Sequence, residues 1–317
     1  MAKASDPIIA SYASKYPKSD WVSIIAAFVL LHRNDPLWQP YLAFLPTNYS
    51  TPLYWTTEEL TVIDGTDLSV DLVGQRDEIQ REWNQWKSLL DLESSKESLG
   101  LRSYPVAPLN YDAFLISWHH IMSRVWTLPV GDLTNKAVMI PMVDVANHYG
   151  KPKVKIEYNK EKGAVTMTAT QPIKAGEQVD VTYGEDSSYK SLKYMGFTIP
   201  NNDRNEDCRI QLIRGPHDSF PRPKKWCLFH ANHKLEKTIQ SCHMGKPMEL
   251  ETLTRVRDLV ITKLRSYPTS IKADTEILKS GEGSTNFVNG VRERRGEKVC
   301  LVAVRKRLDS LIKSKKK

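Results

Sequence analysis

The chain has 317 residues and a formal net charge of +8, with 40% hydrophobic and 26% charged residues. This length supplies one large domain or two smaller ones, and the composition is that of a soluble globular protein. No apolar run reaches the ~18–20 residues that a membrane-spanning helix needs. The longest candidate, Trp21 to Leu31, ends at the polar residues His32, Arg33 and Asn34, so we expect no membrane partner.

The cysteines and the N-terminus bear on the compartment. Four scattered cysteines predict no disulfide framework and therefore indicate a reducing compartment: Cys208, Cys227, Cys242 and Cys300. The first residues lack the continuous apolar core of a signal peptide. We expect an intracellular protein of the cytoplasm and/or nucleus, and an organelle stays open if the chain is N-terminally incomplete.

Part of the positive charge lies in the last residues, 301–317. Such a tail can bind nucleic acid or serve as a nuclear address. It can also be a solvated helix end, where lysines are favoured near the C-terminus. No aromatic residues interleave with these charges as they would on a base-stacking surface. The helix end is therefore the preferred interpretation, and nucleic-acid binding is not expected.

Residues 1–128 are predicted to be almost entirely helical. Apolar residues recur there at the helical period, and capping residues and prolines mark the ends. The predicted helices lie at 20–34 with Asp20 as N-cap, within 36–46, after a Thr cap at 56–60, at about 69–93, and from the N-cap Asn110 to a point before Pro129.

Residues 129–202 change to β-rich patterning. We predict strands at Val138–Val143 and Val179–Tyr183 on their apolar patterns. Lys153–Tyr158 alternates apolar and polar residues, and Val165, Met167 and Ala169 repeat the pattern across a turn, which predicts an antiparallel hairpin. A short helix capped by Asp186 should follow, ending before Gly196 as its C′ residue.

Residues 203–317 are predicted to form a second, mostly helical lobe. Cys208–Ile213 is a possible strand, and 215–245 shows little periodicity. Helical patterning returns at 249–266, at 270–279 and from 285 to the end.

Polar side chains interrupt the β-rich region where its strands end. Asp144, Asn147 and His148 close one apolar run, and Tyr183 closes another that an antiparallel sheet could bring alongside. A buried histidine bonded to a carbonyl, or a tyrosine with its hydroxyl at the surface, would be structural. The same groups can also serve as positioned donors of a reaction centre.

A family resemblance favours the reaction centre. From Arg124 to Phe197 the chain resembles the C-terminal half of a SET domain, in the branch typified by Rubisco large-subunit methyltransferase. The similar branch that methylates a histidine in actin shares the same layout. The resemblance is carried by Ser123-Arg124, then IPMVDVANH, IKAGEQVDVTYG and KYMGF in this order. It implies an α+β, SET-like antiparallel β fold with a pseudoknot, a helical insert and a helical C-terminal substrate-binding lobe.

The resemblance also implies a cofactor, S-adenosylmethionine. Arg124, with Ser123 beside it, would bind the carboxylate of the cofactor, a role suited to a guanidinium fork. Asn147 and His148 would hold its amino group and adenine edge mainly through backbone contacts. Asp144 would support that strand.

The remaining roles concern chemistry and the acceptor. Tyr183 would be the catalytic residue at the pore that joins the cofactor and substrate sides. Tyr158 and Tyr194 would line the substrate channel, and Phe197 would flank the cofactor. Methyl transfer from a sulfonium is an in-line displacement that needs no metal, so positioning carries most of the rate.

These implications give the expected function and its alternatives. We expect a protein-lysine N-methyltransferase, because an aromatic, desolvated channel lowers the pKa of a lysine from about 10.4 and admits its aliphatic stem. A histidine acceptor, or a non-catalytic protein-binding module derived from the same fold, are the alternatives. The expected partner is a protein substrate, and the chain is expected to be a monomer.

Two further stretches contain potential metal or cofactor ligands. The Cys/His-rich stretch from Cys227 to His243 matches no zinc spacing, so we expect no metal. His119 and His120 precede Arg124 on a helix, and either a cofactor-facing or a structural role stays open.

The resemblance leaves one part of a SET domain unmatched. No N-terminal hairpin with Gly-x-Gly, which would form a wall of the cofactor pocket, is found, so the SET domain is expected to be N-terminally incomplete. The candidate explanations are a fragment of an active enzyme, a degenerate relative, or a partner chain that supplies the strands.

Overall fold

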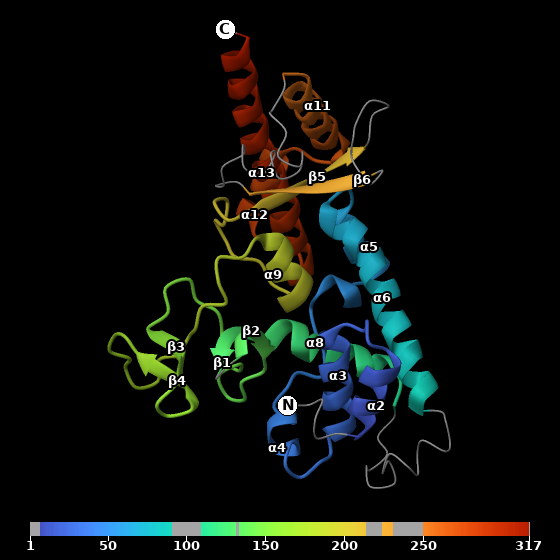
Figure 1. Ribbon diagram of the computed structural model, residues 1–317. Helices are drawn as coiled ribbons and strands as arrows, with labels where there is room; N and C mark the ends of the chain where they lie inside the picture. Colours follow the sequence, from blue (N-terminus) through green and yellow to red (C-terminus); the bar gives the residue numbers. More distant parts are fainter. Residues whose placement is uncertain (1–6, 91–108, 131–132, 214–223, 231–249, 317) are drawn as a thin grey trace. The chain divides into compact units, whose positions relative to one another are not determined.

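The computed structural model describes residues 7–90, 109–130, 133–213, 224–230 and 250–316 (Figure 1). The chain divides into two compact units. The first unit comprises Met1–Tyr49 and Gly74–Glu185, and the second comprises Ser50–Val73 and Asp186–Lys317. The three ranges expected from the sequence, 1–128, 129–202 and 203–317, stay a prediction of the domain organisation.

The first unit contains the helices predicted at 20–34, within 36–46, at about 69–93 and after Asn110, and one helix, α2, that was not predicted. They are α2 (Pro7–Lys15), α3 (Trp21–His32), α4 (Gln39–Leu42), α8 (Tyr111–Arg124) and, from Gly74 on, α6 (Asp67–Leu90). Asp20 and Asn110 cap α3 and α8 as predicted, each accepting a backbone N–H. Helix α8 ends at Arg124, earlier than predicted, because the residues that follow, rich in β-branched and aromatic side chains, form a strand.

Two hairpins complete the first unit. β1 (Trp126–Val130) pairs with β2 (Leu133–Val138), and β3 (Val154–Asn159) pairs with β4 (Ala164–Ala169), both antiparallel. The β3–β4 register places Val154, Ile156 and Tyr158 opposite Ala169, Met167 and Val165. The predicted hairpin is therefore confirmed.

Two predicted strands are wrong. Val138 is the last residue of β2, and residues 141–146 form a turn, since Pro141 has no amide donor and Met142 has a φ of 72°. Within Val179–Tyr183 only Val181 is paired, in an isolated bridge to His148. This bridge is parallel, whereas we predicted an antiparallel approach.

The second unit contains the remaining elements. They are η1 (Pro52–Tyr54), α5 (Thr57–Leu60), η2 (Thr61–Ile63), α9 (Ser188–Met195), β5 (Asp207–Ile213), β6 (Lys224–His230), α11 (Leu250–Ser266), α12 (Ile271–Ser280) and α13 (Thr285–Lys315). β6, which pairs with β5, was not predicted. Gly196 ends α9 in the left-handed conformation as predicted, but Ser187 rather than Asp186 is the N-cap.

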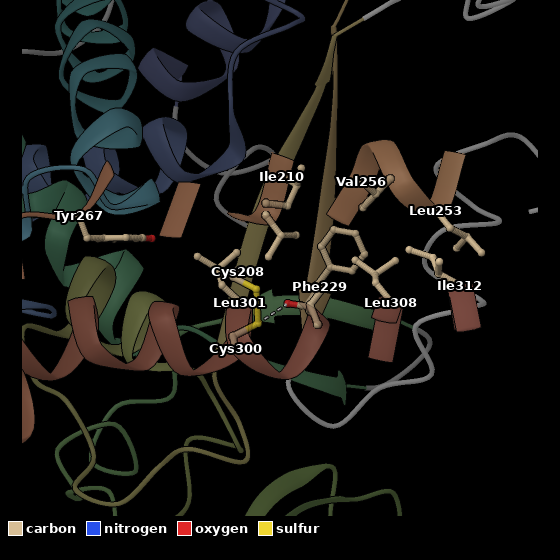
Figure 2. Packing of buried hydrophobic residues seen from close by; sticks show 12 residues of the cluster. Cys208, Ile210, Phe229, Leu253, Val256, Tyr267, Cys300, Leu301, Leu308 and Ile312 are labelled. Atoms are coloured by element: carbon tan, nitrogen blue, oxygen red, sulfur yellow. Dashed lines mark hydrogen bonds between the residues drawn. A yellow bond between two sulfur atoms is a disulfide. The ribbon is translucent and has the colours of Figure 1, made fainter. Parts of the chain in front are cut away.

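The core of the second unit lies among β5, β6, α11 and α13 (Figure 2). Phe229, Leu253, Leu301 and Leu308 are among its buried side chains. Cys208 of β5 and Cys300 of α13 form a disulfide there, which corrects the prediction of no disulfide framework. The two cysteines are 92 positions apart in sequence, so spacing alone could not reveal that the fold brings them together.

Candidate functional site

The candidate site in the first unit is built on the turn after β2. This turn carries Asp144 and leads to Asn147 and His148, while Arg124 ends α8. Arg124 Nη1 donates to the carbonyl oxygen of Asp144 at 2.6 Å. The turn includes Met142 in the left-handed region, a conformation that costs a non-glycine residue about 1 kcal/mol or more. The helix end and the turn are therefore fixed to one another.

Asp144 and Arg124 both present polar atoms without a partner. The Asp144 side chain is buried, and its Oδ2 accepts a hydrogen bond from the Tyr41 hydroxyl. Its Oδ1 and the Nε of Arg124 are buried and have no hydrogen-bond partner among the described residues. Burial raises the pKa of Asp144, while the Tyr41 hydrogen bond and the Arg124 charge act in the opposite direction. Buried groups of this kind are costly to leave unsatisfied, which makes the pair a candidate for ligand binding.

His148 and Tyr183 are joined through backbone and side-chain contacts. The Val181 amide donates to the Asn147 carbonyl at 2.9 Å, and the Tyr149 amide donates to the Val181 carbonyl at 2.7 Å. The Tyr183 amide donates to His148 Nδ1 at 3.0 Å, which makes this nitrogen the acceptor of the imidazole ring. The structure thus brings together the two polar segments that the sequence singled out, although the Asn147 side chain itself is exposed.

The hydroxyl of Tyr183 is oriented. It donates to the carbonyl oxygen of Ala146 at 2.7 Å. Burial raises the pKa of Tyr183, so the phenol stays protonated at neutral pH and can act as a donor. The ring of Trp126 on β1 meets that of Tyr183 edge-on, with centroids 6.2 Å apart. Sequence reasoning missed Trp126, since the residue was assigned to the end of a helix.

The remaining predicted residues of the first unit lie on neighbouring elements. The Ser123 hydroxyl donates to the His119 carbonyl of its own helix at 2.6 Å. Tyr158 lies on β3, which packs against β1, and its side chain is half-buried. Their roles toward a cofactor or a substrate stay predictions.

Tyr194 and Phe197 belong to the second unit. Tyr194 lies on α9, and the ammonium group of the buried Lys193 is 5.3 Å from the centre of its ring. Phe197 follows the C-cap Gly196 and is half-buried. The assignments of Tyr194 to the substrate channel and of Phe197 to the cofactor stay predictions.

Tyr41 and Tyr49 were missed by the sequence analysis, and His119 and His120 were left open there. Tyr41 contacts Asp144, and the Tyr49 hydroxyl lies 2.6 Å from His120 Nδ1. Burial, followed by the nearby charge of Arg124, lowers the pKa of His120 to about 3, and burial lowers that of His119 to about 4. Both imidazoles are therefore neutral near pH 7, and the structure gives His120 a hydrogen-bonded, structural setting.

Two expectations of absence can be compared with the described residues only. Within them, no group of three or more His, Cys, Asp or Glu side chains is arranged to hold a metal ion. The His-rich part of the Cys227–His243 stretch lies largely outside the described residues. None of the described helices is long and apolar enough to cross a bilayer.

Comparisons with known proteins agree with this architecture. Residues 224–306 match the protein family described as Rubisco LSMT substrate-binding. The chain is 26% identical over 325 residues to the actin-histidine N-methyltransferase of Homo sapiens, covering 87% of this chain and 54% of that protein. With the enzyme of the same name from Canis lupus familiaris, identity is 26% over 242 residues, covering 75% and 40%.

Solved structures of SET proteins share the fold of this chain. The SET domain of LSMT bound to lysine and AdoHcy superposes with a TM-score of 0.72, at 20% identity, over 99% of this chain and 78% of that one. Rubisco LSMT bound to AdoMet gives 0.68 at 19% identity, over 97% and 78%. The predicted resemblance to the Rubisco LSMT-like branch of SET proteins and the predicted α+β fold are confirmed. The chain spans about half the length of the curated relatives it matches.

Proposed function

We propose that this chain is an S-adenosylmethionine-dependent protein N-methyltransferase of the SET type. The observation that carries the proposal is the convergence of Arg124, Asp144, His148 and Tyr183 in the first unit of a SET fold. The two curated relatives named above are actin-histidine N-methyltransferases, which supports the same reaction class.

The residues present fit the cofactor. A guanidinium with a buried, unpartnered Nε suits the carboxylate of an amino acid, so Arg124 would hold that end of S-adenosylmethionine. Asn147 and His148 would flank it from the bridge to Val181. When bound, S-adenosylmethionine supplies a methyl group on a sulfonium, which the reaction transfers in line to a nucleophile. The neighbouring LSMT structures hold AdoMet and AdoHcy, which supports this cofactor.

Tyr183 would orient the acceptor nitrogen and the transferred methyl group. Its hydroxyl donates its one proton to the Ala146 carbonyl, so the hydroxyl oxygen is held as an oriented acceptor beside that carbonyl. Hydroxyl and carbonyl oxygens of this kind can also hold a polarised methyl group by weak C–H···O contacts. Such fixed groups accelerate a displacement by orientation, without a covalent intermediate.

We propose histidine as the preferred acceptor. The lysine acceptor predicted from the sequence is not confirmed, and the two curated relatives named above are actin-histidine N-methyltransferases. Histidine is also the less demanding nucleophile, because an imidazole with a pKa near 6.5 is largely neutral at pH 7, whereas a lysine must first lose a proton. Lysine stays the second candidate because the LSMT structures that share the fold bind lysine and methyl-lysine.

The proposal is tested first by calorimetric titration of the purified chain with S-adenosylmethionine. Saturable binding with one site per chain is the expected result. The absence of binding would overturn the enzymatic proposal for this chain and favour the non-catalytic protein-binding module.

The acceptor is tested by incubating the chain with actin or Rubisco and the labelled cofactor. Mass spectrometry then locates the methylated residue. A methylated histidine is the expected result. A methylated lysine in either protein would instead identify lysine as the acceptor.

A further inference from the structure

Tyr41, from the helical N-terminal region, contacts the group around Arg124 and has no role in the proposed reaction so far. Tyr41 lies on α4, 103 positions before Asp144, and its hydroxyl donates to the Asp144 carboxylate. Asp144 in turn accepts a hydrogen bond from Arg124 at its backbone carbonyl. A chain of contacts therefore runs from α4 through the turn to the end of α8.

We infer that Tyr41 is a positioning residue for the candidate cofactor site, acting through Asp144 on Arg124. This inference rests on the proposed function and deepens it. Asp144 is 4% exposed as a residue, and one of its carboxyl oxygens is fixed by Tyr41 while the other has no hydrogen-bond partner among the described residues. Fixing the carboxylate also fixes the peptide carbonyl that orients the guanidinium, so the unpartnered Nε points in one direction.

The guanidinium of Arg124 binds the backbone carbonyl of Asp144, and its charge also acts on the Asp144 carboxylate. Arg124 and Asp144 are the two charged groups of the cluster, whereas Tyr41, Tyr49 and His120 contribute neutral hydrogen-bonding groups. A hydrogen bond from a neutral phenol can hold the carboxylate without cancelling its charge. The Nε of Arg124, which has no hydrogen-bond partner among the described residues, is therefore available for an anionic group such as the carboxylate of an amino acid.

The hydroxyl of Tyr41 can be removed with little change in packing. We expect Tyr41→Phe to weaken the affinity for S-adenosylmethionine about tenfold, the usual effect of losing a hydrogen bond to a charged group. Tyr16→Phe is the matched control, because Tyr16 lies in the same unit just beyond α2 and makes no contact with Asp144. Calorimetry should show the loss for Tyr41→Phe and an unchanged dissociation constant for Tyr16→Phe.

A double-mutant cycle tests whether the effect passes through Arg124. Arg124→Ala should weaken binding by itself, and adding Tyr41→Phe to it should change the dissociation constant by less than about twofold. A merely structural role of Tyr41 would give additive losses. Full affinity in Tyr41→Phe, or additive losses in the cycle, would overturn the inference.

A second readout needs no cofactor. In protein labelled with ¹⁵N-arginine, the Nε–H signal of Arg124 is identified by its disappearance in Arg124→Lys. Tyr41→Phe should shift this signal and Tyr16→Phe should not. If the wild-type chain bound no S-adenosylmethionine, the proposed function would fail, and the Arg124 signal would still decide the inference: an unshifted signal in Tyr41→Phe overturns it.

Discussion

The hydroxyl of Tyr183 is held in one orientation by its contacts. It is oriented by the Ala146 carbonyl, and its backbone amide is bound to His148. The ring position is thus determined by backbone contacts as well as by the hydroxyl. Removing the hydroxyl should therefore reduce methyl transfer while the ring of residue 183 keeps its position in the site.

We predict that Tyr183→Phe lowers the methyl-transfer rate by about 10²-fold or more, the scale expected for one oriented group in a reaction centre. The dissociation constant for S-adenosylmethionine should change by less than about threefold, because the ring and backbone contacts stay. Single-turnover kinetics and calorimetry measure the two quantities. An active Tyr183→Phe protein would refute the catalytic assignment, and Tyr16→Phe serves as the control.

A second residue-scale feature is the close approach of α13 to η2 at Gly290. A Cβ atom built on Gly290 would lie 2.2 Å from Cγ1 of the buried Val62 and 3.3 Å from Cγ2 of Ile63. Both neighbours are branched, with few alternative rotamers. The contact therefore requires a residue without a side chain.

Gly290→Ala should lower the free energy of unfolding by about 1–3 kcal/mol through overpacking, despite the higher helix propensity of alanine. Gly74→Ala is the matched control, since Gly74 is also helical and has no atom within 4 Å of a built Cβ. This control should be neutral or gain up to ~1 kcal/mol. Urea denaturation of the three proteins gives the comparison, and equal midpoints for Gly290→Ala and Gly74→Ala would contradict it.

At the scale of elements, the sequence predicted those helices and strands that are determined by contacts between residues close in the chain. Caps such as Asp20 and Asn110 and the alternation in β3 and β4 were read correctly because their partners lie a few residues away. Val179–Tyr183 was misread because its pattern fits a strand, whereas a strand also needs a partner, and only Val181 finds one. β6 has no regular alternation and forms by pairing with β5.

The N-cap of α9 offers an element-scale test. The Ser187 side chain accepts from the Lys190 amide, and the residue is 2% exposed. Ser187→Ala should lower the free energy of unfolding by about 1 kcal/mol. Asp186→Ala is the control, because Asp186 makes a surface ion pair with Lys190, worth about 0.5 kcal/mol. Thermal unfolding of both variants shows which loses more stability. A larger loss for Asp186→Ala would identify Asp186 as the N-cap, as the sequence predicted.

At the scale of the whole molecule, the resemblance predicted the fold and the candidate residues of the site, but not the groups that support them. Tyr41 is 103 positions from Asp144 and Tyr49 is 71 positions from His120. Neither lies in a motif, and their partners become apparent only when the chain is folded. The same holds for a group of buried carboxyls in the second unit, contributed by segments far apart in sequence.

These carboxyls give the second unit a distinctive response to pH. Glu293 is 1% exposed and neither carboxyl oxygen has a hydrogen-bond partner among the described residues. Glu297, Glu206 and Asp67 surround it, and Lys263 is the nearby cation. Burial and these like charges raise the pKa of Glu293 well above its usual value, and burial raises those of Glu206 and Glu297 to about 7.

The raised pKa values fix the sign of the pH dependence. Above about pH 4.5 the unfolded chain releases these protons, while the folded unit retains them until about pH 7. The folded state then binds more protons, so its stability falls as pH rises, by about 1.4 kcal/mol per pH unit for each retained proton. The buried His119 and His120, whose pKa values are lowered, act in the opposite sense below pH 6.5 in the first unit.

Glu293→Gln isolates one of these protons, because glutamine mimics the protonated acid and does not titrate. The free energy of unfolding of this variant, minus that of the wild type, should rise between pH 5 and pH 7.5, and the histidine contribution cancels because both proteins share it. Glu282→Gln, in an exposed loop, is the control and should show no such rise. Urea denaturation at several pH values measures the difference. A difference that stays constant with pH would mean that Glu293 is ionised in the folded protein, and the burial of its carboxyl group among Glu297, Glu206 and Asp67 would then have to be compensated by a cation.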